Sequence, residues 1–202
     1  MTALRELVYM PISELSEKIQ KKAISPVEVT QAMLSRGDEL EPQLHAFNTI
    51  FRDEVLEAAH AAEAEIQRGE YRGPLHGVPI GIKDIYECGP TTCGSQSLEH
   101  YVAEKDCTSV AKLKEAGALI LGKTATYEFA YGFPTNQSYY KPTHNPWNLA
   151  HDAGGSSSLA AGGLPAAAGG ARDRRLEGLV RRRDLHNTPH SERQQQCWRW
   201  WW

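Results

Sequence analysis

Residues 73–84, GPLHGVPIGIKD, constrain the fold of this chain more than any other segment, because they place a lysine at the end of an apolar run. Val78, Ile80 and Ile82 precede Lys83, and this pattern of β-branched residues is typical of a core strand. A lysine at the end of such a strand loses hydration, and desolvation disfavours its charged form. Because a neutral amine is a base, Lys83 is a candidate general base. The structural alternative is a lysine whose ammonium group reaches water.

A second candidate site is a cluster of glycines and serines, Gly154-Gly155-Ser156-Ser157-Ser158. Glycines allow the tight turns that expose a neighbouring hydroxyl, and a serine hydroxyl next to a base becomes a nucleophile or a proton carrier. The alternative for this composition is a flexible Gly/Ser linker.

Five segments together resemble the amidase signature family, and they occur in the family's order. They are ISPVEVTQAML (24–34), GPLHGVPIGIKD (73–84), DCTSVAKLKEAGALILGKT (106–124), YEFAYGFPTNQSYYKPTHNPWN (127–148) and AGGSSS (153–158). The resemblance covers roughly residues 10–170. It implies an α/β fold with a mixed sheet flanked by helices, the amidase signature fold. Because the family's fold is more than twice this length, we expect a C-terminally truncated version of it.

The resemblance also implies hydrolysis of a small-molecule amide by a serine–serine–lysine relay, with no metal and no organic cofactor. By motif, Lys83 is the base, and Ser156, on a cis peptide bond, is the bridging serine. Ser157 takes the bridging role if the loop is aligned one residue differently. Gly154, Gly155 and Ser157 are then the active-site loop.

The serine that attacks the amide in this family has no counterpart in the sequence. In the family, this serine lies in a glycine-rich loop. Two alignments of that loop place the nucleophile at Val180 or near Arg175, and neither is a serine. Ser191 is the only serine after Ser158. We therefore expect this chain to be inactive as it stands. Two alternatives stay open: a non-catalytic truncated fragment or binding remnant, and a glutaminase like the ammonia-releasing component of the tRNA-dependent amidotransferases. The loop YGFPTNQS (131–138) looks more like that of general amidases.

Hydrophobic periodicity predicts helices over residues 13–22, 25–40 and 52–68, and a further helix that begins at Asp106 or Thr108 and ends at 116. Strands are predicted over residues 78–83 and 118–121, and a long loop over 131–152. The alternation of strand, helix and strand favours an α/β sheet covered by helices.

Composition changes abruptly near residue 170. The net charge is −7 over residues 1–170 and +4 over residues 171–202, and four of the five tryptophans lie in the last five positions. We therefore divide the chain into an amidase-like part, 1–170, and an aberrant Arg/Trp-rich tail, 171–202, either disordered or read from a shifted frame. A new interaction segment is the alternative. Pro189 argues against a metal site at His186 and His190.

The sequence favours a cytoplasmic protein, because four cysteines are too few for a disulfide scaffold and no signal peptide or membrane-spanning run is present. The arginines of the tail lack the motifs of nucleic-acid or membrane-surface binding, so we expect neither partner. The sequence does not specify the oligomeric state.

Overall fold

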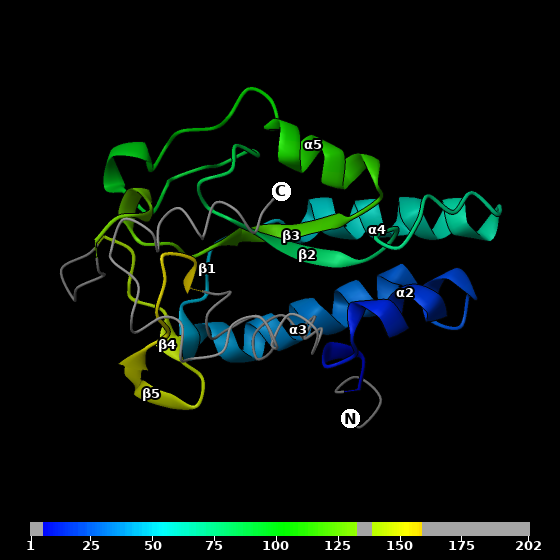
Figure 1. Ribbon diagram of the computed structural model, residues 1–202, viewed down its shortest axis with the longest axis horizontal. Coiled ribbons are helices and arrows are strands. Elements are labelled where there is room, and N and C mark those ends of the chain that lie inside the picture. The colour runs from blue at the N-terminus through cyan, green and yellow to red at the C-terminus, as the bar shows by residue number, and fades with distance from the viewer. Residues whose placement is uncertain (1–5, 133–138, 159–202) are drawn as a thin grey trace, which may run out of the picture. The chain divides into compact units, whose positions relative to one another are not determined.

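A three-stranded mixed sheet forms the centre of the fold (Figure 1). The computed structural model describes residues 6–132 and 139–158. Strand β3 (Leu119–Thr124) lies between β1 (Phe47–Ile50) and β2 (Pro79–Lys83), antiparallel to β1 and parallel to β2. All six residues of β3 are buried, as expected for a central strand. The predicted α/β class with a mixed sheet is confirmed.

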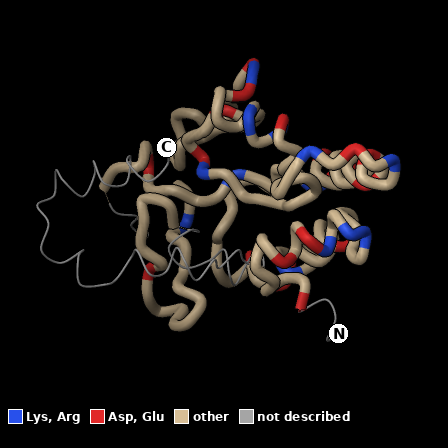
Figure 2. The backbone as a smooth tube through the Cα atoms, turned by 45° about the vertical axis from the view of Figure 1, so that its right-hand side comes forward, with Lys and Arg blue, Asp and Glu red and all other residues tan. Residues whose placement is uncertain are grey.

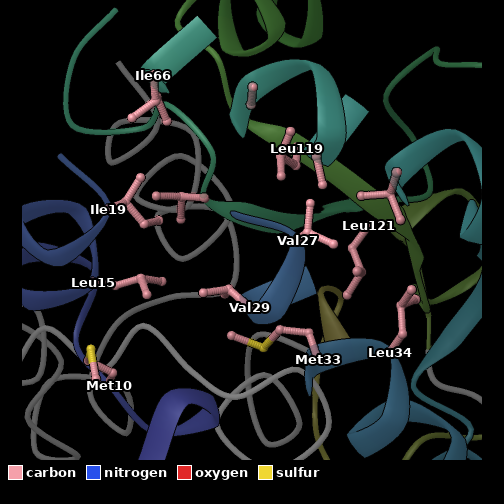
Figure 3. Packing of buried hydrophobic residues seen from close by; sticks show 14 residues of the cluster. Met10, Leu15, Ile19, Val27, Val29, Met33, Leu34, Ile66, Leu119 and Leu121 are labelled. Atoms are coloured by element: carbon pink, nitrogen blue, oxygen red, sulfur yellow. The ribbon is translucent and has the colours of Figure 1, made fainter. Parts of the chain in front are cut away.

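The longer helices that accompany the sheet in the described residues are α2 (Ile12–Gln20), α3 (Pro26–Leu44), α4 (Arg52–Gln67) and α5 (Thr108–Glu115). Side chains alternate across a strand, so consecutive residues of β3 face opposite layers. Leu119 and Leu121 join a core cluster with residues of α2, α3 and α4, which Figure 3 shows from close by. Ile120 instead packs with Val110 of α5. The helices thus cover both faces, and β2 and β3 are parallel because α5 carries the chain back between them.

The predicted helices are present, with shifted ends. Ser25 begins α3 with a capping box: its hydroxyl accepts from the N–H of Val27, and Glu28 accepts from the N–H of Ser25. The helix continues past the predicted end to Leu44, whose side chain is buried against Ala46.

Helix α5 begins at Thr108, one of its two predicted starts, and not at Asp106. Cys107 is the residue that precedes the helix, and its side chain makes no capping hydrogen bond. The Asp106 carboxylate instead forms an ion pair with Lys114, 2.7 Å away, in the last turn of the same helix.

The segment predicted as a long loop contains a small hairpin of β4 (His144–Asn145) and β5 (Asn148–Asp152). The N–H of Trp147 donates to the side-chain oxygen of Asn145, which closes the turn. Figure 2 shows charges of both signs interspersed along the helices, whereas the hairpin is nearly free of them. No helix within residues 6–132 and 139–158 is long and apolar enough to cross a membrane.

Candidate functional site

Lys83 and Ser156 meet at the carboxyl end of the sheet. Lys83 is the last residue of β2, and its Nζ donates to Ser156 Oγ at 2.8 Å. Both residues are half-buried, so the pair lies at the border between the core and the surface. When the amine is neutral, the same contact allows the serine hydroxyl to donate its proton to the nitrogen.

The end of β3 holds the two residues together. Lys83 is paired with Thr124 in the parallel register of β2 and β3, and Ser157 forms an antiparallel bridge with Thr126, two residues further along. The N–H of Ser158 also donates to the carbonyl of Ala125, at 3.2 Å. Residues 124–126 therefore determine the positions of both the lysine and the serine segment.

The main chain of Ser156 is fixed by two donors. Its carbonyl accepts from the hydroxyl of Thr126 at 2.8 Å and from the N–H of Tyr127 at 3.2 Å. The peptide bond between Gly155 and Ser156 is cis. A Cβ at Gly155 would lie 2.7 Å from ring atoms of Tyr127, so only glycine fits against that ring.

Asp152 fixes the beginning of the loop. One of its oxygens accepts from the N–H of Gly154 at 2.6 Å and from the hydroxyl of Tyr127 at 3.2 Å. Gly154 has φ +82°, a conformation that favours glycine. Burial and, after it, the Asp152 carboxylate raise the pKa of Tyr127 to about 12, so the phenol stays neutral and keeps donating.

A second lysine lies deeper in the fold. Lys123 of β3 is fully buried and forms an ion pair with the equally buried Asp84, at 3.2 Å. Its ammonium also donates to the carbonyl of Tyr86 at 2.6 Å and to the hydroxyl of Thr91 at 2.7 Å. These partners satisfy a buried charge, which is the condition for tolerating one in a protein interior.

Asp84 connects this buried network to Lys83, which precedes it in the chain. Its carboxylate accepts from Asn48, 2.8 Å away, and from the hydroxyl and N–H of Thr92. Its own N–H donates to Thr124, so the residue after Lys83 is held on both its main chain and its side chain.

The structure thus brings together two of the residues singled out in the sequence, Lys83 and Ser156. Gly154 and Gly155 form the loop before the serine, whereas Ser157 pairs through its backbone with Thr126. The alternative nucleophile positions, Val180 and Arg175, and the pair His186 and His190 lie outside the described residues. Within the described part of the chain, no group of three or more His, Cys, Asp or Glu residues is placed to hold a metal ion.

Sequence reasoning missed the residues that support this pair: Asp84, Lys123, Thr126, Tyr127 and Asp152. Asp84 and Lys123 carried a usable signal, because Lys123 is a charged residue inside an apolar strand and Asp84 directly follows another. Thr126, Tyr127 and Asp152 carried none, because their roles depend on contacts between distant segments.

Comparison with known proteins adds a second, independent observation. The family model named Amidase matches residues 28–170, which is most of the described part of the chain. The chain belongs to the amidase signature family. Its core strands, the Lys83 segment and the Gly154–Ser158 loop all lie inside the matched region.

Amidase relatives include a glutamyl-tRNA(Gln) amidotransferase subunit of Carboxydothermus hydrogenoformans, 45% identical over 163 residues, which cover 80% of this chain and 34% of the relative. The peptide amidase of Stenotrophomonas maltophilia is a solved structure with 32% identity and a TM-score of 0.67, over 74% of this chain and 32% of that one. A fatty acid amide hydrolase matches at 26% identity and a TM-score of 0.73, over 82% of this chain and 29% of that one. The chain spans about a third of the length of the curated relatives it matches.

Proposed function

We propose that this chain carries the base and the bridging serine of an amide-hydrolysing site, with Lys83 and Ser156 in these roles. The observation that carries the proposal is the 2.8 Å contact between Lys83 Nζ and Ser156 Oγ. A base within hydrogen-bond reach of a hydroxyl is the geometry that proton transfer requires. Membership of a family whose solved members include amidases supports the same chemistry.

In this mechanism neutral Lys83 accepts the proton of Ser156. Ser156 then accepts a proton from the attacking hydroxyl, which forms a bond to the amide carbon. The amine leaves with a proton returned through Ser156, and water releases the acid from the acyl-enzyme. The two positions expected for the attacking serine are occupied by Arg175 and Val180. We therefore propose that the 202-residue chain alone does not turn over unactivated amides.

Two substrate classes are candidates. The curated relatives named as glutamyl-tRNA(Gln) amidotransferase components favour glutamine as the ammonia donor. The solved amidases among the structural neighbours, together with the loop YGFPTNQS (131–138), favour a general carboxamide. Ammonia release from glutamine, compared with that from benzamide and a peptide amide, separates the two classes.

The test is a chimera in which residues 1–158 replace the matching part of the Carboxydothermus relative, so that the remainder of a whole family member is supplied. We expect amide hydrolysis by the chimera to fall by at least ~10²-fold in Lys83→Ala and in Ser156→Ala, the range of a lost general base. Ser109→Ala and Lys112→Ala, at exposed positions of α5, are matched controls and should leave the rate unchanged. Retained turnover in either site variant contradicts the assignment. A folded chimera with no hydrolysis of any amide favours the non-catalytic remnant.

We further propose that residues 171–202 are not part of the amidase fold and arise from a shifted reading frame. The family match ends at residue 170, and the net charge changes from −7 before this point to +4 after it. Resequencing codons 150–202 tests this proposal. A neighbouring frame that restores a glycine-rich loop ending in serine supports the frame shift, and an uninterrupted reading frame contradicts it.

A further inference from the structure

We propose that Ser156 is itself a nucleophile in this chain, and that it accepts acyl and phosphonyl groups from activated esters and fluorophosphonates. The proposal rests on the role of Lys83 as base. It differs from the bridging role, because here the oxygen of Ser156 forms the covalent bond.

The geometry of the pair is that of an activated hydroxyl. Ser156 Oγ lies 2.8 Å from Lys83 Nζ, and a nucleophile in hydrogen-bond contact with its base is the arrangement found in Ser–Lys hydrolytic sites. Both residues are half-buried, and Gly155, which precedes the serine, is exposed and has no side chain to block an approaching reagent. The serine therefore lies directly beside an exposed position of the chain that carries no side chain.

A second lysine–hydroxyl contact in the same fold provides an internal comparison. Lys123 Nζ lies 2.7 Å from Thr91 Oγ1, almost the same separation. However, Lys123 is fully buried, forms an ion pair with Asp84 and donates to the carbonyl oxygen of Tyr86. Proximity is thus common to both pairs, but Lys123 and Thr91 are buried, whereas Lys83 and Ser156 are only half-buried.

The surroundings hold the main chain of Ser156 in place, and the carboxylates of Asp84 and Asp152 have hydrogen-bond partners of their own. The carbonyl of Ser156 is fixed by Thr126 and Tyr127. Asp84 is engaged with Lys123, Asn48 and Thr92, and Asp152 accepts from Tyr127 and Gly154. The serine is therefore a positioned group and not one of several freely rotating hydroxyls in a linker.

The covalent step balances without a co-reactant. With p-nitrophenyl acetate, Ser156 Oγ bonds to the acetyl carbon, its proton moves to Lys83 Nζ, and p-nitrophenolate leaves with the electron pair of the broken C–O bond. With a fluorophosphonate, Oγ bonds to phosphorus and fluoride leaves. Lys83 carries the proton in both products.

The experiment uses the 202-residue chain and a fluorophosphonate probe, with intact mass and peptide mapping as readouts. We expect one adduct per chain, mapped to Ser156, and loss of labelling in 6 M urea. Labelling should be absent in Ser156→Ala and at least ~10²-fold slower in Lys83→Met, where the base is lost but the stem is kept. Ser109→Ala and Lys112→Met, on the exposed surface of α5, are the matched controls. The rate with wild-type chain should rise with pH and level off, and this plateau should be absent in Lys83→Met.

Peptide mapping on the wild-type chain decides the proposal even if a variant fails to fold. An adduct on Ser157 or Ser191, labelling that persists in urea, or equal rates for wild type and folded Lys83→Met would each overturn it. The chimera separates this outcome from the relay: if Ser156 is unlabelled but chimera activity still needs both residues, the nucleophile proposal fails and the proposed function stands. If Ser156 is labelled but the chimera tolerates its loss, the proposed function fails.

Discussion

Lys83 Nζ and Ser156 Oγ lie 2.8 Å apart although the two residues are 73 positions apart in the chain. The contact depends on β3, because Lys83 pairs with Thr124 at its end and Ser157 pairs with Thr126 just beyond it. A single buried strand therefore sets the positions of both groups, and the network of Asp84 and Lys123 anchors that strand to the segment after Lys83.

Lys123→Met should lower the free energy of unfolding by about 3–5 kcal/mol, because it leaves the carboxylate of Asp84 buried without its cation. Urea unfolding followed by circular dichroism measures the change. Lys112→Met removes an exposed charge from α5 and should change stability by less than about 0.5 kcal/mol. Equal stability of Lys123→Met and wild type would show that the buried pair is not structural.

Gly155→Ala should reduce amide hydrolysis by the chimera and destabilise the chain by about 1–3 kcal/mol, the usual effect of overpacking. The added methyl group would lie 2.7 Å from the ring of Tyr127, which is itself buried and cannot move aside. The loop before Ser156 would then have to shift. Wild-type rates in this variant would mean that the ring does not fix the loop.

Much of the fold could be predicted from local sequence. The capping box at Ser25, the apolar positions of α2 and the β-branched run before Lys83 each encode their own element, and all three elements are present. Local patterns do not reveal strand β1, because four residues between two helices carry little periodic signal. The hairpin of β4 and β5 lies in a segment predicted as a loop, since both of its strands are short and rich in residues typical of turns.

Tyr127 should make the chain lose stability as pH rises from about 10 toward 12. Its folded pKa is about 12, whereas an unfolded tyrosine titrates near 10, so the unfolded chain loses the proton first in this interval. The stabilisation that the neutral Tyr127 phenol provides is fully present below about pH 10. Urea unfolding at pH 8 and pH 11 should show a smaller alkaline loss in Tyr127→Phe than in wild type. Identical losses would contradict the burial of a neutral phenol beside Asp152.

Ser25→Ala should destabilise the chain by about 1 kcal/mol, the typical effect of losing a helix N-cap. The hydroxyl of Ser25 accepts from Val27 in the first turn of α3, whose residues Val29 and Met33 lie in the main core. Ser109→Ala, inside α5 and exposed, is the control and should be near neutral. If Ser25→Ala changes stability no more than the control does, the Ser25 cap does not stabilise α3.

The site was predictable only in part. Lys83 and Ser156 belong to motifs, so the family resemblance was sufficient to single them out. The hydroxyl of Thr126, the ring of Tyr127 and the carboxylate of Asp152 act through contacts with Ser156, Gly155 and Gly154, which local patterns do not encode. The expectation of a buried catalytic lysine was also incomplete: Lys83 is half-buried, and the fully buried lysine is Lys123.

The proton relay between Lys83 and Ser156 is tested most directly by a double-mutant cycle on amide hydrolysis in the chimera. If the two residues act as one unit, Lys83→Ala, Ser156→Ala and the double variant should lose activity to a similar extent, with the double variant within a few-fold of the worse single variant. If the two losses multiply, each residue acts independently, and the relay is contradicted.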